Sequence, residues 1–329
     1  MKTLLTGASG FLGSAVLRLL VAEGHDVRLL LRNASDRRNI NGIEAEIVEG
    51  DLSDRDSLKT AVTSCDYLIH VAADYRLWIP DPENMYRTNV DGTRMLMQLA
   101  QEAGVRKIVY TSSVATLGIH ADHTPANEES PVSLDDMIGH YKRSKFLAEE
   151  EVKKLVRESN LPATIVNPST PIGPRDIKPT PTGRIIVDCV NGKIPAYVDT
   201  GLNIVHVDDV ARGHLLALEK GEIGERYILG GEDMPLKEIL SCICKITGQK
   251  PPGISLPHNL VIPFAWIVER WAAISGIEPL ATVDGIRMAK KHMFFSSRKA
   301  VTQLGYSSRS ASEAISDAVN WFIEQGYCS

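Results

Sequence analysis

The chain has 329 residues, of which 43% are hydrophobic and 23% are charged, and its formal net charge is -5. This length and composition predict a soluble globular enzyme with a large core, built as one large domain and a smaller one. No basic run is interleaved with aromatic residues, so the sequence argues against nucleic-acid binding. The five cysteines lack the paired spacing of a metal site, and we expect reduced thiols and no bound metal.

The N-terminus has the order strand, glycine-rich turn and helix. A strand is predicted over Lys2–Leu5, glycines follow at positions 7, 10 and 13, and a helix is predicted over Ser14–Ala22. Glycines in this place allow a tight turn and close approach of the backbone to a pyrophosphate, and the helix N-terminus offers free N–H groups. Three glycines also occur in ordinary flexible turns, but their position between strand and helix favours a dinucleotide site. The predicted contacts are Gly7, Ser9, Gly10, Phe11, Leu12 and Gly13. Because the first strand begins at residue 2, no room is left for a cleavable signal peptide, and we expect a cytoplasmic protein.

Strand-length apolar runs then alternate with helix-length amphipathic runs. This alternation predicts an α/β fold of the Rossmann type, a doubly wound parallel sheet with helices on both faces. After Pro168 the alternation ends, and prolines and glycines crowd the chain as far as Gly183. We therefore predict a nucleotide-binding domain over residues 1–168 and a smaller, mostly helical substrate-binding lobe over 169–329, interleaved with late elements of the first domain. The further strands are expected over Asp26–Leu31, Ala45–Glu49, Tyr67–Val71, Lys107–Thr111 and Ala163–Asn167.

The end of the second predicted strand indicates which dinucleotide is bound. NAD-binding folds commonly place a carboxylate here for the ribose hydroxyls, whereas an arginine suits the 2'-phosphate of NADP. The chain has Leu31 and Arg32 at this point and no carboxylate before Asp36. Arg32 can offer a fork of donors to a phosphate, with Arg37 and Arg38 in support, although a solvated strand-end arginine is the alternative. NADP(H) is favoured over NAD(H).

Two later strand ends are also candidates for cofactor contact. Asp51 can reach an adenine amino group while Leu52 packs against the ring, but Asp51 also suits the cap region of the helix expected near residue 54. Ala72 and Ala73 follow the fourth strand, where small side chains let a cofactor lie against the backbone. These alanines also fit plain packing, so both interpretations stay open.

Tyr141 and Lys145 are one helical turn apart on a predicted helix over Gly139–Val156, so they share one face. A nearby ammonium stabilises a phenolate and lowers the pKa of the tyrosine towards neutrality. The fifth strand ends in Ser112 and Ser113, and a hydroxyl at this edge can hold a substrate oxygen while Tyr141 transfers the proton. The sequence therefore predicts a nicotinamide-dependent acid/base site.

Together these motifs resemble the extended short-chain dehydrogenase/reductase superfamily over nearly the whole chain. By this resemblance, Tyr141 is the acid/base, Lys145 binds the nicotinamide ribose, Ser113 holds the substrate oxygen, and Pro168 contacts the cofactor. The superfamily usually has Arg-Pro where this chain has Asn167-Pro168. The matching segments are Thr6-Gly7-x-x-Gly10-x-x-Gly13, Asp51-Leu52, His70-Val71-Ala72-Ala73, Asn89-Val90-Asp91-Gly92-Thr93, Thr111-Ser112-Ser113, Tyr141-x-x-x-Lys145, Asn167-Pro168, Gly173-Pro174-Arg175 and His206-Val207-Asp208-Asp209-Val210.

Within the superfamily, the segments 70–78, 133–145 and 167–183 are most similar to hopanoid-associated sugar epimerases and dihydroflavonol 4-reductases. Two enzyme classes follow: a reductase that uses NADPH for net hydride transfer, and a sugar or nucleotide-sugar epimerase with no net redox change. A non-catalytic nucleotide-binding regulator is a third class, which the full set of Ser113, Tyr141 and Lys145 disfavours.

The substrate side and the partners are less defined. We expect a small-molecule substrate, with contacts from Ser112, Tyr75, Trp78 and Thr170, although Trp78 also suits core packing between the lobes. The apolar stretch 256–276 is interrupted by Pro263 and charged residues, so it is too short to span a bilayer. We consider three interpretations of this stretch: core packing, a lid over a hydrophobic substrate, and peripheral membrane contact. The resemblance further implies a homodimer formed through the helix that carries Tyr141.

Overall fold

A seven-stranded parallel sheet forms the centre of the larger domain. The structure is a computed structural model, and it describes residues 1–76, 79, 81–275 and 283–328. The strand order is β10-β6-β5-β4-β1-β2-β3, and every pairing is parallel. The order reverses between β1 and β4, and ligands of open parallel sheets bind at the carboxyl ends of strands beside such a reversal. The strands are β1 (Lys2–Thr6), β2 (Asp26–Leu31), β3 (Glu46–Glu49), β4 (Tyr67–His70), β5 (Lys107–Thr111), β6 (Ala163–Pro168) and β10 (Arg226–Leu229).

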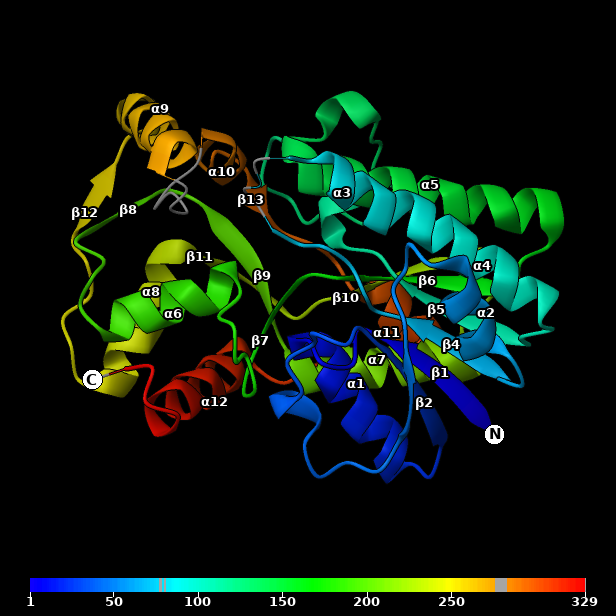
Figure 1. The fold of residues 1–329 in the computed structure, drawn as a ribbon. Coiled ribbons are helices and arrows are strands. Elements are labelled where there is room, and N and C mark those ends of the chain that lie inside the picture. The colour runs from blue at the N-terminus through cyan, green and yellow to red at the C-terminus, as the bar shows by residue number, and fades with distance from the viewer. Residues whose placement is uncertain (77–78, 80, 276–282, 329) are drawn as a thin grey trace.

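Helices cover both faces of this sheet (Figure 1). One face packs against α1 (Phe11–Ala22), α7 (Val207–Lys220) and α11 (Arg298–Leu304). The other face packs against α2 (Arg55–Val62), α4 (Thr93–Glu102) and α5 (Gly139–Ser159). The strands are buried on both sides, which explains why they read as nearly continuous apolar runs in the sequence. Shorter helical segments are η1 (Arg38–Ile40), α3 (Glu83–Tyr86), the π-helix η2 (Arg87–Gly92), η3 (Val114–Thr116) and η4 (Leu134–Asp136).

The smaller lobe has a core of its own, between α6, α8, α12 and a short sheet. The chain enters it at β7, returns to the large domain for α7 and β10, and returns again for α11. In this sheet β9 pairs with β7, β11 and β13, while β8 and β12 form a separate two-stranded sheet. The elements are β7 (Thr170–Ile172), α6 (Pro181–Val190), β8 (Ala196–Val198), β9 (Gly201–His206), β11 (Glu232–Pro235), α8 (Leu236–Thr247), β12 (Ile254–Leu256), α9 (His258–Ser275), α10 (Val283–Ala289), β13 (His292–Met293) and α12 (Ala311–Glu324).

The predicted Rossmann-type fold is confirmed, with two differences in detail. The first helix begins at Phe11 rather than Ser14, because Gly10 already has the extended backbone of an N-cap. The small lobe contains short strands as well as helices. Along α9, Ala265 is buried, whereas Leu260, Trp266 and Trp271 are exposed. Within the described part of the chain, no helix combines the length and the apolarity needed to cross a membrane.

The glycine turn after β1 depends on missing side chains at two positions. Gly7 has a φ of +76°, and a Cβ on it would lie 2.7 Å from the backbone nitrogen of Ala72. A Cβ on Gly13 would lie 2.0 Å from the carbonyl oxygen of Gly7. Both contacts are with backbone, which has little freedom to move away. The turn therefore packs α1 directly against β1.

We expect Gly13→Ala to lower the free energy of unfolding by about 2 kcal/mol, because the added methyl forces the turn apart. Urea denaturation measures this loss. Gly253→Ala is the matched control, since nothing lies within 4 Å of a Cβ at that glycine and its φ is not positive. Equal unfolding midpoints for the two variants would contradict the packing argument.

Candidate active site

The N-terminus of α1 presents backbone N–H donors beside the glycine turn. Its N-cap, Gly10, has no side chain to accept from the first helical N–H groups. The first four N–H groups of a helix have no partner within the helix, and they carry the positive end of its dipole. The turn has no room for a Cβ at Gly7 or Gly13, so it packs closely against Ala72 and the start of α1. These features fit the pyrophosphate of a dinucleotide.

Arg32 lies just beyond the end of β2 and is exposed. Among the described residues, its guanidinium makes neither a hydrogen bond nor an ion pair. Burial raises the pKa of Asp51, but hydrogen bonds from Ser53 and, to a smaller extent, the charge of Arg32 lower it overall. The two arginines expected to assist it are engaged, since Arg37 pairs with Glu49 at 3.1 Å and Arg38 with Asp36 at 2.8 Å. Arg32 is thus the cation at this strand end whose donors are free for a ligand.

Asp51 and Leu52 follow β3 and have separate environments. An oxygen of Asp51 accepts hydrogen bonds from the backbone and hydroxyl of Ser53, at 2.9 and 2.6 Å. The cap of α2 is Asp54, which accepts from the backbone of Asp56. Asp51 is therefore a turn residue outside the helix cap. Leu52 is buried in the core beside Gly92.

A buried histidine fixes the backbone at the end of β4. His70 hydrogen-bonds through Nδ1 to Thr6 at 2.7 Å and through Nε2 to Thr93 at 3.0 Å. The same Thr6 hydroxyl accepts from the backbone nitrogen of Ala72 at 3.1 Å. Burial and the charge of Lys145 together lower the pKa of His70 to about 3, so the ring is neutral. This arrangement holds the backbone of Ala72 beside Gly7.

Tyr141 and Ser113 meet between α5 and the end of β5. Ser113 is the N-cap of η3, and its hydroxyl accepts from the backbone of Ala115 at 3.1 Å. Burial raises the pKa of Tyr141 above its ordinary value, and a hydrogen bond with the Ser113 hydroxyl opposes this shift. The phenol therefore keeps its proton at neutral pH. The structure brings together two of the predicted catalytic side chains.

The side chain of Lys145 extends from α5 to the end of β5. Its Nζ donates to the Tyr110 hydroxyl at 3.1 Å and to the carbonyl of Thr111 at 2.7 Å. Burial lowers the pKa of Lys145 to about 8, while the negative charge of Glu149 raises it. The sequence predicted that Lys145 lowers the pKa of Tyr141, but the ammonium is held by Tyr110 and Thr111, and burial dominates at Tyr141.

A buried carboxylate, Glu149, lies one helical turn beyond Lys145 and connects α5 with η3, β6, β10 and the end of β5. Its side chain is 1% exposed and pairs with Lys153 at 2.7 Å and with Arg226 at 3.1 Å. Burial raises its pKa, but the cations and hydrogen bonds outweigh burial and lower the pKa overall. One oxygen accepts from Ser112 at 2.5 Å, from Thr116 at 2.8 Å and from Asn167 at 3.0 Å.

Asn167 extends the network to the predicted catalytic serine. Its amide also donates to the backbone carbonyl of Ser113 at 3.0 Å. The network thus ties α5 to the ends of β5 and β6, on either side of Ser113. The Ser112 hydroxyl points into this network, so its expected substrate contact stays a prediction that the geometry does not favour. Ser113 is the strand-end hydroxyl that faces Tyr141.

The π-helix η2 anchors the loop after β4. Asn89 accepts from the backbone nitrogen of Asp74 at 2.7 Å and donates to its carbonyl at 2.8 Å. The same amide donates to the Ser144 hydroxyl at 3.0 Å, which connects this loop to α5. A π-helical turn is often found at a functional site. The loop that holds Tyr75 is therefore fixed against the helix that carries Tyr141.

The other predicted contacts lie around this centre. Tyr75 is 46% exposed in the loop after β4. Pro168 is the buried last residue of β6, and Thr170 begins β7 and is half-buried. Trp78 lies outside the described residues. These substrate and cofactor contacts remain predictions.

Sequence reasoning missed Tyr110, Glu149 and the connecting role of Asn167. A signal for Glu149 was present, because positions 141, 145 and 149 recur at four-residue spacing along one helix face. Tyr110 carried no such signal. It looked like an ordinary aromatic residue of a buried strand.

Comparison with known proteins assigns the family. Residues 3–230 match the NAD dependent epimerase/dehydratase family, and the chain belongs to it. The chain is 44% identical over 326 residues to the putative dihydroflavonol 4-reductase of Synechocystis sp., covering 98% of this chain and 94% of that one. It is 36% identical over 329 residues to sterol demethylase protein B of Methylococcus capsulatus, covering 99% of each. The crystal structure of gox2253 has a TM-score of 0.90 and 56% identity, covering 99% of both chains.

The predicted resemblance to extended short-chain dehydrogenases/reductases is confirmed by these matches. Members of this group are reductases, epimerases and dehydratases, and the protein is an enzyme of the same group. The family is NAD(P)-dependent, which agrees with the donors around the glycine turn.

We expect Glu149→Gln to lower the free energy of unfolding by about 3 kcal/mol, because Lys153 and Arg226 lose a buried anion and an amide cannot accept from every donor. Urea denaturation measures the effect. Glu150→Gln is the control, since Glu150 also pairs with Lys153, at 3.1 Å, but is 44% exposed. It should cost less than about 1 kcal/mol. If both variants lose the same free energy of unfolding, the buried network stabilises the fold no more than an exposed ion pair does.

Proposed function

We propose that the protein is an NADPH-dependent reductase that converts a ketone to a carbinol, with Tyr141 as the acid. The observation that carries the proposal is Arg32, a cation free of protein partners in the described structure, at the strand end where a 2'-phosphate would bind. Asp36, the first carboxylate after β2, pairs with Arg38. Residues 32–36, which follow β2, therefore contain no unpaired carboxylate to bind the ribose hydroxyls of NAD.

The residues around the glycine turn fit a dinucleotide, and different residues would bind its different groups. The N–H groups at the start of α1 would hold the pyrophosphate, Arg32 the 2'-phosphate, and Ala72 and Ala73 the flat face of the cofactor. When bound, the nicotinamide supplies the hydride. Lys145 keeps its proton at pH 7, because its pKa is about 8, and its ammonium would bind the ribose beside the reacting carbon.

The chemistry of this chain is a proton transfer at one oxygen. The Ser113 hydroxyl would donate to the substrate carbonyl and place it beside the phenol of Tyr141. Because burial holds the pKa of Tyr141 above its ordinary value, the phenol is protonated and can donate as negative charge grows on that oxygen. The same pair can remove a proton from a carbinol, so an NAD(P)-dependent sugar epimerase is the alternative function.

The proposal extends to location and assembly. We expect a cytoplasmic enzyme of small molecules that forms a homodimer through α5. This helix runs over Gly139–Ser159 and packs beside α4 on one face of the sheet. A dimer built on α5 would brace the helix that carries Tyr141.

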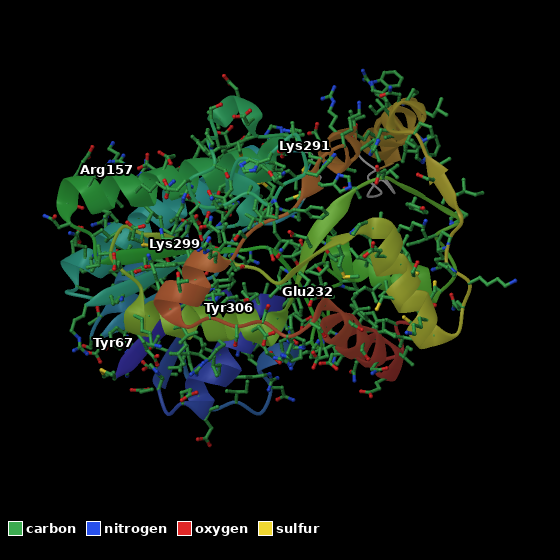
Figure 2. The ribbon with its side chains drawn as sticks, turned by 180° about the vertical axis from the view of Figure 1, so that it is seen from behind. Tyr67, Arg157, Glu232, Lys291, Lys299 and Tyr306 are labelled. Carbon is green, nitrogen blue, oxygen red and sulfur yellow. The ribbon has the colours of Figure 1, made fainter. Side chains whose placement is uncertain are left out.

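A direct test uses a dihydroflavonol, the substrate class in the name of the Synechocystis relative, with NADPH absorbance as readout. We expect one NADPH to be consumed per carbinol formed. Tyr141→Phe should lower kcat by about 100-fold or more, because the acid is lost. Tyr67→Phe is the control, because Tyr67 is the first residue of β4 and lies at the end of that strand away from the site (Figure 2). The activity of this control variant should equal that of the wild type.

Turnover of Tyr141→Phe within a few-fold of the wild type would refute the proposed proton transfer. Inversion of a sugar carbon in UDP-glucose, with no consumption of NADPH, would replace the reductase by the epimerase.

Arg32→Ala should weaken NADPH binding by about tenfold to a hundredfold, because a charge-assisted hydrogen bond to the 2'-phosphate is lost. Binding of NADH should be unaffected, and calorimetric titration measures both dissociation constants. Arg37→Ala is the control, since Arg37 already pairs with Glu49. Equal weakening of NADPH and NADH by Arg32→Ala would contradict the assignment.

A further inference from the structure

The outer side of α9 is apolar where a surface helix is normally polar. Leu260, Trp266 and Trp271 are 71%, 55% and 67% exposed. Ile254 and Leu256 on the adjoining strand β12 are 59% and 39% exposed. We name these five side chains the α9 face. Large exposed apolar residues gathered on neighbouring elements indicate an interaction surface.

The inner side of α9 is occupied by contacts within the lobe. Ala265 is fully buried, and His258 hydrogen-bonds to the carbonyl of Ala289 at 3.0 Å. Glu269 accepts from the backbone nitrogen of Val283 at 3.0 Å. Helix α10 therefore covers one side of α9 and leaves the apolar side outward. Figure 2 shows α9 at the periphery of the smaller lobe, with side chains extending away from the protein.

The charges around this face are mainly positive. Residues 250–291 contain five lysines and arginines and three acidic residues, a net +2 in a chain of net charge -5. The five cations (Lys250, Arg270, Arg287, Lys290 and Lys291) are all exposed. Of the two acids in the described part of this segment, Glu269 bonds to Val283 and Asp284 pairs with Arg287 at 3.6 Å.

Cations also lie directly beside the exposed apolar residues. The guanidinium of Arg270 lies 5.1 Å from the ring centre of Trp266. Lys290 donates to the side chain of Asn259 at 3.1 Å, next to Leu260. Lys291, labelled in Figure 2, follows at the end of α10. Tryptophan and aliphatic side chains bordered by lysine and arginine are typical of helices that lie in the interface of an anionic bilayer.

We propose that the α9 face docks the protein onto the surface of an anionic phospholipid membrane. Tryptophan, leucine and isoleucine side chains insert at the level of the headgroups, while Arg270, Lys290 and Lys291 contact lipid phosphates. The contact is peripheral, because the helix lies along the surface. It is independent of the reaction proposed above, and it would bring the smaller lobe next to the bilayer.

The test is sedimentation of the full chain with vesicles of phosphatidylcholine and phosphatidylglycerol in equal parts, and with vesicles of phosphatidylcholine alone. We expect binding to the anionic vesicles, weakened by salt, and a blue shift of tryptophan fluorescence on binding. The double variant Trp266→Ala, Trp271→Ala should bind at least about tenfold more weakly. Its control is Val301→Ala, Ile323→Ala, which removes exposed apolar side chains from other helices.

A second pair of variants tests the charges. Lys290→Gln, Lys291→Gln should weaken binding by about fivefold for each lysine removed. Lys193→Gln, Lys245→Gln removes exposed lysines elsewhere and should have no effect. All variants should keep the melting temperature and NADPH affinity of the wild type, since the changed side chains are exposed.

Three results would overturn the proposal. The first is no binding of the wild type to anionic vesicles, and the second is equal binding by the tryptophan variant and its control. The third is a wild-type dimer that the tryptophan variant converts to a monomer, with no vesicle binding by either, which would assign the α9 face to a second copy of the chain.

Discussion

The buried carboxylate of Glu149 is the constraint on which the site depends. A carboxylate can be buried only if cations and donors replace the water that it loses. Here Lys153 and Arg226 supply the charge, while Ser112, directly after β5, and Asn167, in β6, supply hydrogen-bond donors. The hydrogen bonds and ion pairs of this one carboxylate therefore hold α5 and the ends of β5 and β6 in fixed positions relative to one another. The Ser113 hydroxyl and the Tyr141 phenol meet because their supporting elements share this network.

The electrostatics of the site follow from the same burial. Lys145 is held by Tyr110 and Thr111 and balanced by Glu149, so its pKa falls only to about 8 and it stays charged at pH 7. Burial raises the pKa of Tyr141, and the hydrogen bond with Ser113 offsets this only in part. The phenol is thus a ready acid, which suits reduction of a ketone. A cation and a protonated acid side by side also leave the site able to stabilise a developing oxyanion.

The larger domain could be predicted from the sequence because its signals are local. The glycine turn lies between a strand and a helix, and each sheet strand is an apolar run of ordinary length, so the Rossmann-type sheet followed directly. Tyr141 and Lys145 were found because they share a helix face. Partners distant in sequence could not be found in this way, since the contact of Glu149 with Arg226 joins residues 77 positions apart. The orientation of α9 was equally beyond prediction, because an apolar helix looks the same whether its partner is the core or an outside surface.

In the proposed reaction, the enzyme carries out net hydride transfer with a cofactor that it binds and releases. The most direct measurement is chromatography of the nucleotide freed when the purified protein is denatured. The account predicts that no stoichiometric nucleotide remains after gel filtration, because NADP(H) must leave after each turnover. One NAD retained per chain would contradict it, since a permanently held cofactor serves a reaction with no net redox change.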